Sequence, residues 1–158
     1  MLKQLSVILL AAVSALAFSC SNQGEEESII QFEVIHGGAY ASVSEKKQVM
    51  VTNNDDYQKL MGEVYANLDQ MPRIPEVDFT KNDVVAVFMG AKNTSGYSIN
   101  IDKVIKRTDA VTVSIYETSP GAKCILTQAI TQPYEIVKVP KLNQKVKYIL
   151  KQRTKDCP

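Results

Sequence analysis

Apolar and polar side chains alternate through much of the chain, and this alternation predicts strands, because successive residues of a strand face opposite sides. Residues 28–35 alternate and are rich in Ile, Phe and Val, and the following His36-Gly37-Gly38 indicates a turn. The same reasoning predicts further strands at residues 40–43, 48–52, 97–105, 111–116, 124–130, 134–139 and 146–150.

Two stretches carry more detail about burial. Residues 84–89 form a near-continuous apolar run, which is typical of a strand that is covered on both faces. In residues 97–105 the alternation places Tyr97, Ile99, Ile101 and Lys103 on one face of the strand.

One stretch has a helical period instead. Apolar residues recur at intervals of three and four from Tyr57 to Leu68, which predicts one apolar stripe that packs in the core. Thr52 and Asn53 are suitable N-cap residues, and proline residues after position 70 end the helix. The pattern therefore predicts an amphipathic helix over about 53–68.

This order of elements predicts an α+β fold that is mainly β. Consecutive strands with short connections favour an antiparallel sheet, or a partly closed β-sandwich, packed on the one helix. The length suits a single domain, which we place at residues 28–158.

The first residues have the pattern of a targeting signal. Residues 1–19 have the layout of a secretory signal, and the run Leu16-Ala17-Phe18-Ser19-Cys20 resembles a bacterial lipobox, whose Cys is acylated. A spanning anchor is the alternative, but the apolar run is shorter than the roughly 20 residues that cross a bilayer. We expect residues 20–27 to form an acidic, flexible tether. We expect an exported protein, lipid-anchored at Cys20 to the bacterial outer membrane, at its periplasmic face or at the cell surface.

The number and distribution of charged residues limit the possible partners. The chain carries 18 Lys and Arg against 17 Asp and Glu, a balance that argues against a nucleic-acid binder. The charges are unevenly distributed, because residues 138–155 contain seven basic side chains and no acidic one. They could form a face for an acidic partner or anionic lipid, or they could be solvated lysines that protect a sheet edge.

Three cysteines are present, and one His leaves little material for a metal site or a His-dependent active site. If Cys20 carries lipid, Cys124 and Cys157 remain. An exported protein meets an oxidising environment, which favours a disulfide between them over two free thiols.

The stretch from Gly90 to Tyr97 joins two predicted strands and is the most distinctive loop. It lacks the spacing of a phosphate loop, and Thr94 and Ser95 have no evident base partner. It is either a recognition loop or a structured turn. In a second cluster, Tyr134 follows Pro133 and is either an interface anchor or a core aromatic.

Acid–base chemistry has no evident basis in the pattern. The carboxylates that could contribute are scattered without a convergent spacing, so we expect each to be a surface charge. They are Asp78, Asp83, Asp102, Glu117 and Glu135.

Several motifs together resemble the C-terminal domain of the protease complex subunit PrcB family. They are Asp78-Phe79, Val84-Val85-Ala86-Val87, Gly90, Thr94-Ser95-Gly96-Tyr97-Ser98-Ile99, Val104, Val111-Thr112-Val113, Pro120-Gly121, Cys124, Thr131, Pro133-Tyr134-Glu135-Ile136-Val137 and Val139-Pro140-Lys141. The resemblance covers about residues 78–150, and Ser95 stands where the family usually has Gly. It implies a small exported domain, often lipid-anchored, whose namesake is an accessory subunit of a surface protease.

A shorter similarity points to chagasin-like cysteine protease inhibitors. Residues 93–97 and 132–134 are similar in style to two of their binding loops, although the first loop lacks its Pro, Gln132 replaces Arg and Tyr134 replaces Trp.

We therefore expect a non-enzymatic, membrane-anchored lipoprotein that binds an envelope or surface protease as an accessory subunit. It needs no metal, cofactor or nucleic acid. Its candidate binding residues are Thr94, Ser95, Gly96, Tyr97, Pro133 and Tyr134. A direct protease inhibitor and a ligand-binding or structural envelope lipoprotein are the alternatives.

Overall fold

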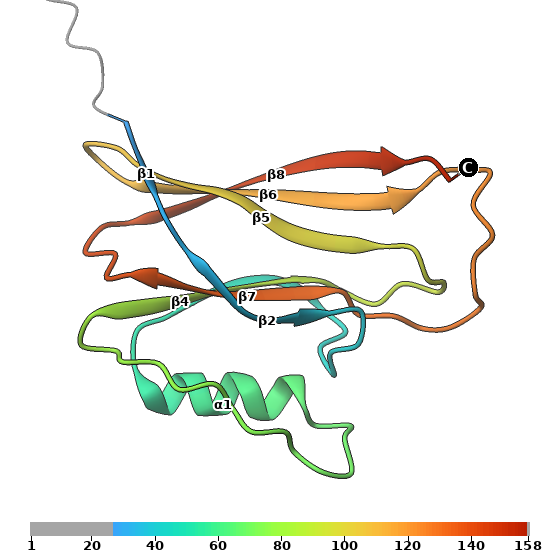
Figure 1. The fold of residues 1–158 in the computed structure, drawn as a ribbon, viewed down its shortest axis with the longest axis horizontal. Coiled ribbons are helices and arrows are strands. Elements are labelled where there is room, and N and C mark those ends of the chain that lie inside the picture. The colour runs from blue at the N-terminus through green and yellow to red at the C-terminus, as the bar shows by residue number, and fades with distance from the viewer. Residues whose placement is uncertain (1–26, 158) are drawn as a thin grey trace, which may run out of the picture.

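In the part of the chain that the structure describes, two four-stranded sheets and one helix are stacked in three layers, with the β2-β7-β4-β3 sheet in the middle (Figure 1). The computed structural model describes residues 27–157. The elements are β1 (Ser28–Ile30), β2 (Glu33–Gly38), β3 (Lys46–Val51), α1 (Asn54–Val64), β4 (Asn82–Met89), β5 (Ser98–Lys106), β6 (Val111–Pro120), β7 (Tyr134–Pro140) and β8 (Val146–Lys155).

Three sequence expectations lie outside the described residues: the signal over 1–19, lipidation of Cys20, and the tether up to residue 26. Within residues 27–157, no helix is both long enough and apolar enough to cross a membrane.

The middle layer explains the apolar run in β4. Its alternate residues Val84, Ala86 and Phe88 face α1, whereas Val85, Val87 and Met89 pack against the outer sheet, β1-β5-β6-β8. All six are buried, so the predicted coverage on both faces is confirmed. The α+β, mainly β class is confirmed as well.

Strand pairing is antiparallel with one exception. β6 and β8 run parallel, so the expectation of an antiparallel sheet is wrong at this pair. The cause is a change of sheet. β7 ends in the middle layer at Pro140, and the chain enters the outer sheet at Val146, beside the first residue of β6.

The helix begins where the sequence predicts and ends earlier. Asn53 is the N-cap, and its side-chain oxygen accepts the Asp56 N–H at 2.9 Å. After Val64, however, the carbonyl that would accept the Leu68 N–H accepts the Ser42 N–H instead, at 3.0 Å. The predicted end at residue 68 is therefore wrong, because a neighbouring segment takes the acceptor of the next helical turn.

Residues 28–35 were expected to form one strand, and the structure divides them between two sheets. β1 pairs with β5 in the outer sheet, and the chain crosses at Gln31 and Phe32 to pair as β2 with β7 in the middle sheet. The turn expected at residues 36–38 is wrong, since they continue β2. A Cβ on Gly37 would lie 3.2 Å from the Tyr134 carbonyl oxygen, so the close approach of the β7 backbone explains why glycine is present at this position.

Three finer expectations also fail. Residues 40–43 form only a single bridge, from Tyr40 to Gln132, and residues 124–130 form no strand. In β5 a register shift between Ile101 and Lys103 moves Lys103 off the buried face, and Val104 takes the inward position.

Candidate functional site

Three carboxylates that were expected at the surface are buried: Asp83, Glu117 and Glu135. The Asp83 side chain is 1% exposed, and its Oδ1 lies 2.7 Å from the Lys141 Nζ. Its other oxygen accepts the Leu142 N–H at 2.7 Å. Desolvation of a charge is costly unless it is paired, and here the Lys141 ammonium supplies the opposite charge and the Leu142 N–H hydrogen-bonds one oxygen.

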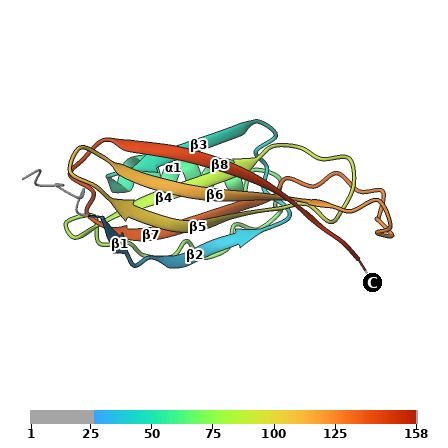
Figure 2. The same cartoon turned by 90° about the horizontal axis from the view of Figure 1, so that it is seen from above.

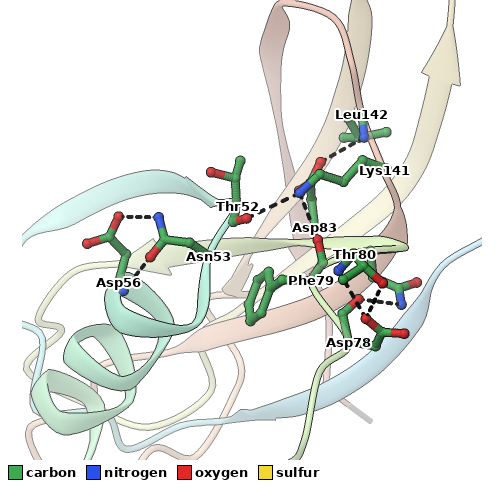
Figure 3. A network of polar contacts seen from close by, with 10 residues as sticks. Thr52, Asn53, Asp56, Asp78, Phe79, Thr80, Asp83, Lys141 and Leu142 are labelled. Carbon is green, nitrogen blue, oxygen red and sulfur yellow. Dashed lines mark hydrogen bonds and ion pairs between the residues drawn. The ribbon is translucent and has the colours of Figure 1, made fainter.

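Lys141 joins several segments at this point (Figure 3). Its ammonium also donates to the carbonyl oxygens of Thr52 and Phe79, at 3.2 and 3.1 Å. Nearby, the Asp78 carboxylate accepts from the Thr80 N–H and hydroxyl at 3.0 and 2.6 Å. Two of the motifs behind the family resemblance, Asp78-Phe79 and the one ending in Lys141, thus build a structural junction.

The other two buried carboxylates connect the sheets. Glu135 of β7 accepts from the Ile101 N–H at 2.6 Å and the Asn100 side chain at 2.9 Å, both on β5. Glu117 of β6 lies 2.7 Å from the Nζ of Lys46 on β3. These contacts hold the two sheets together at the end where the 90–97 loop lies.

Two glycines shape that loop. Gly90 and Gly96 have φ angles of +77° and +91°, in the left-handed region that favours glycine. A Cβ on Gly96 would also lie 3.0 Å from side-chain atoms of Pro120 and Leu126. Its conformation and its neighbours both require glycine.

Backbone bonds join this loop to the β6–β7 connection. Lys92 and Thr131 exchange N–H···O bonds of 2.8 and 2.9 Å, and the Ser95 N–H donates to the Thr127 carbonyl at 3.0 Å. The Ser95 hydroxyl accepts the Thr127 N–H at 2.9 Å, and the Thr131 hydroxyl donates to the Thr94 carbonyl at 3.0 Å. Ser95 therefore satisfies a backbone group, as the alternative of a structured turn predicts, whereas Thr94 takes part through its own backbone carbonyl.

A third segment, residues 39–41, bonds to the β6–β7 connection. The Gln132 N–H donates to the Ala39 carbonyl at 2.8 Å, and the Ala41 N–H donates to the Gln132 carbonyl at 3.2 Å. We call residues 39–41, 91–97 and 122–132 the loop surface. Seen from above, the β4–β5 and β6–β7 connections extend past the strands at one end (Figure 2).

Large apolar side chains are exposed on the loop surface. Tyr40 is 68% exposed, Ile130 is 65% exposed and Ile125 is fully exposed. Sequence reasoning missed these residues, because it assigned residues 40–43 and 124–130 to strands. The available signal was that Ile125 directly follows a cysteine expected in a disulfide.

That disulfide is confirmed. Cys124 and Cys157 are bonded, with their Cα atoms 5.0 Å apart. The Gly121 N–H also donates to the Lys155 carbonyl at 2.9 Å. The bond therefore ties the end of the chain, just past β8, to the loop surface.

A cavity of about 420 Å³ lies next to the loop surface, between β2 and β5. His36, Tyr97 and Tyr134 are among its lining residues. The Tyr134 hydroxyl and the His36 Nδ1 are 2.6 Å apart. Burial lowers the pKa of His36 below its usual value, and burial, with a smaller effect of Tyr65, raises the pKa of Tyr134 to about 12. A neutral His36 and the un-ionised Tyr134 hydroxyl therefore share this hydrogen bond, with the donor set by the His36 tautomer.

The predicted candidate residues are thus brought to one end of the molecule in different environments. Tyr97 is half-buried at the cavity, and the Lys92 Nζ lies 5.6 Å from its ring centroid. Pro133 and Tyr134 are buried, and Tyr134 stacks on Phe88 with ring centroids 6.0 Å apart. Within residues 27–157, no cluster of three or more His, Cys, Asp or Glu residues could hold a metal ion.

Comparison with known proteins gives one match. Residues 84–140 match the family described as PrcB C-terminal, a segment that covers β4 from Val84 to the end of β7 and leaves α1 and β8 outside. No curated protein and no solved structure matches the chain. The match includes the 90–97 loop and the β6–β7 connection, which form most of the loop surface.

Proposed function

From the match of residues 84–140 to the PrcB C-terminal family, we propose that this chain is a non-enzymatic accessory protein that binds an exported protease through the loop surface. The observation that carries the proposal is the exposure of Tyr40, Ile125 and Ile130 on segments that are bonded to one another. Exposed apolar side chains that gather on one part of a soluble domain mark contact sites for other proteins.

The loops of the loop surface are held in one conformation, which favours binding of a partner. A loop that is already held in its bound conformation loses little conformational freedom when a partner binds. Here two loops are joined by reciprocal backbone bonds between Lys92 and Thr131, and the disulfide fixes Cys124 beside Ile125. Tyr97 adds a half-buried aromatic ring beside the cavity, the kind of residue that dominates many protein interfaces.

The non-enzymatic part of the proposal is supported by how the buried carboxylates are used. Asp83, Glu117 and Glu135 each pair with a group from another segment of the fold, so their charge is already committed to structural contacts. His36 is likewise hydrogen-bonded to Tyr134. A general acid or base needs a lone pair or proton that can reach a substrate.

We place the protein at the outer membrane, exported and held by lipid on Cys20, on the basis of the lipobox-like run before this residue. The anchor would keep the loop surface close to other envelope proteins.

A direct protease inhibitor has less support than an accessory subunit. The similarity to chagasin-like inhibitors depends on a second loop that would present Pro133 and Tyr134, and both residues are buried. Inhibition of a cysteine or serine protease by the purified chain alone would instead favour the direct inhibitor.

The test is chemical cross-linking in native membranes, followed by purification of the chain and mass spectrometry of what it captured. Wild type is compared with Tyr97→Ala, Thr94→Ala and Ile125→Asp. If Tyr97 and Ile125 are central contacts, losing either should weaken capture of one exported protease about 30-fold or more.

Leu68→Asp is the matched control, because Leu68 is an exposed apolar residue after α1, outside the loop surface. Capture at the wild-type level by Leu68→Asp, with loss in Ile125→Asp, supports the proposal. Undiminished capture by folded Tyr97→Ala and Ile125→Asp variants refutes it.

A further inference from the structure

The outward side of the β1-β5-β6-β8 sheet carries basic side chains in register. In β6, Val113 and Ile115 point into the core, so Ser114 and Tyr116 point outward. Pairing places Lys103 beside Ser114, Lys151 beside Tyr116 and Lys147 beside Thr112. We call Lys103, Lys147, Lys151 and Arg153, with Tyr116 among them, the basic face.

Two of these cations share one aromatic ring. The Lys151 Nζ lies 5.6 Å and the Arg153 Cζ lies 4.8 Å from the centroid of Tyr116. The Arg153 Nε also donates to the Thr118 hydroxyl at 2.8 Å. Both side chains therefore lean over β6, toward the middle of the sheet. Protection of the β8 edge explains cations along β8, but it does not require this inward orientation.

Their charge is largely uncompensated. Among residues 27–157, Lys103, Lys151 and Arg153 have no carboxylate within 4.0 Å, whereas Lys147 pairs with Asp109 at 3.0 Å. Two further exposed acids are near these cations along the chain: Asp102, next to Lys103 at the register shift in β5, and Asp156, three residues after Arg153. Like charges held close together repel, and a bound anion relieves that repulsion.

Two further features indicate a membrane surface as the occupant. Ile149 is 44% exposed beside Ser114, and Ile29 of β1 is 64% exposed, so apolar side chains lie among the cations. In addition, the described chain begins at Glu27, directly before β1 of this same sheet. Residues 1–26, with the proposed lipid anchor at Cys20, are therefore joined to the described chain at the outer sheet.

We propose that the basic face docks on the anionic phospholipid headgroups of a membrane, with Lys151 and Arg153 binding headgroup phosphates. A guanidinium and an ammonium over the same ring can both bind phosphate oxygens, and several cations on one sheet face can contact several headgroups of a bilayer. This inference does not depend on the loop surface or on a protease partner.

Vesicle co-sedimentation tests it, with a chain of residues 27–158. Every strand, α1 and both apolar clusters lie between Ser28 and Lys155, so this chain keeps the contacts of the described fold. Vesicles of phosphatidylcholine alone are compared with vesicles that also contain phosphatidylglycerol, at low and high salt. Binding should require phosphatidylglycerol and weaken as salt screens the charges.

The variant Lys151→Gln with Arg153→Gln should bind about 25-fold more weakly, at roughly fivefold for each cation removed. The matched control is Lys59→Gln with Lys81→Gln, which makes the same change in net charge at two exposed lysines outside the outer sheet, one in α1 and one directly before β4. It should retain most of the binding.

Two outcomes overturn the inference. One is no dependence on phosphatidylglycerol, which is also what an acidic protein as the occupant predicts. The other is an equal loss in the control, which would show that net charge alone acts. Tyr97→Ala should bind vesicles like wild type, so the failure of this inference is distinguishable from the failure of the proposed function.

Discussion

Lys141 and Asp83 show how a single pair can hold several segments. Asp83 is almost fully buried, and Lys141 is the cation within 4.0 Å of it among the described residues. A buried carboxylate that loses its partner keeps its desolvation cost and gains nothing in return. The residue pattern predicted a surface charge at Asp83, because a lone Asp before an apolar strand does not reveal which distant lysine will cover it.

Lys141→Met should therefore lower the free energy of unfolding by about 3 kcal/mol, because it leaves the Asp83 charge buried and unpaired. Denaturant unfolding measures this change. Lys138→Met is the control, since Lys138 pairs with the exposed Glu33, and it should cost less than about 1 kcal/mol. Equal losses in the two variants would contradict the assigned role of the buried pair.

Gly96 makes a second prediction at this scale. Gly96→Ala should cost about 1–3 kcal/mol, because it forces a side chain into the left-handed region, and its Cβ would crowd Pro120 and Leu126. Gly62→Ala is the opposite case, since no atom lies within 4 Å of a Cβ there and Gly62 is inside α1. It should stabilise the protein by about 0.5–1 kcal/mol. A Gly96→Ala variant with an unchanged free energy of unfolding would show that the loop adopts another conformation.

Elements differ in how far the sequence predicts them. β4 and the start of α1 were predictable, because an apolar run and an N-cap with an apolar stripe are local signals. The division of residues 28–35 between two sheets was not, since both halves alternate alike and only their pairing with β5 or β7 separates them. The same holds for residues 124–130, in which Thr127 bonds to Ser95 of the 90–97 loop instead of joining a ladder.

In the candidate site, too, only the features with a local sequence signal were predictable. Thr94, Ser95, Gly96 and Tyr97 were identifiable from their loop composition, but the exposure of Ile125 depends on contacts between distant segments.

The disulfide is the link between β8 and the loop surface. Replacing both cysteines, Cys124→Ser with Cys157→Ser, should lower the free energy of unfolding by about 2–4 kcal/mol, because the unfolded chain regains the freedom of a closed loop. Hydrogen exchange should accelerate at the Thr127 and Thr131 amides, which bond within the loop surface, and stay unchanged in α1. Unchanged exchange at both threonine amides would show that the backbone bonds alone order the loops.

At the scale of the whole molecule, the covered middle sheet separates two surfaces. Its faces are occupied by α1 and by the outer sheet, which leaves the loop surface at one end and the basic face on the outside (Figure 1). A protein docked on a membrane through the basic face would still present the loop surface to the side. The proposed anchor and the proposed protease partner can therefore be engaged together.

Site-specific photo-cross-linking in living cells tests the central claim most directly. A photoreactive amino acid replaces Ile125, which is fully exposed on the loop surface, or Leu68, which is exposed after α1. The account predicts one adduct with an exported protease from position 125 and none from position 68. The same adducts from both positions, or an adduct from position 68 alone, would contradict it.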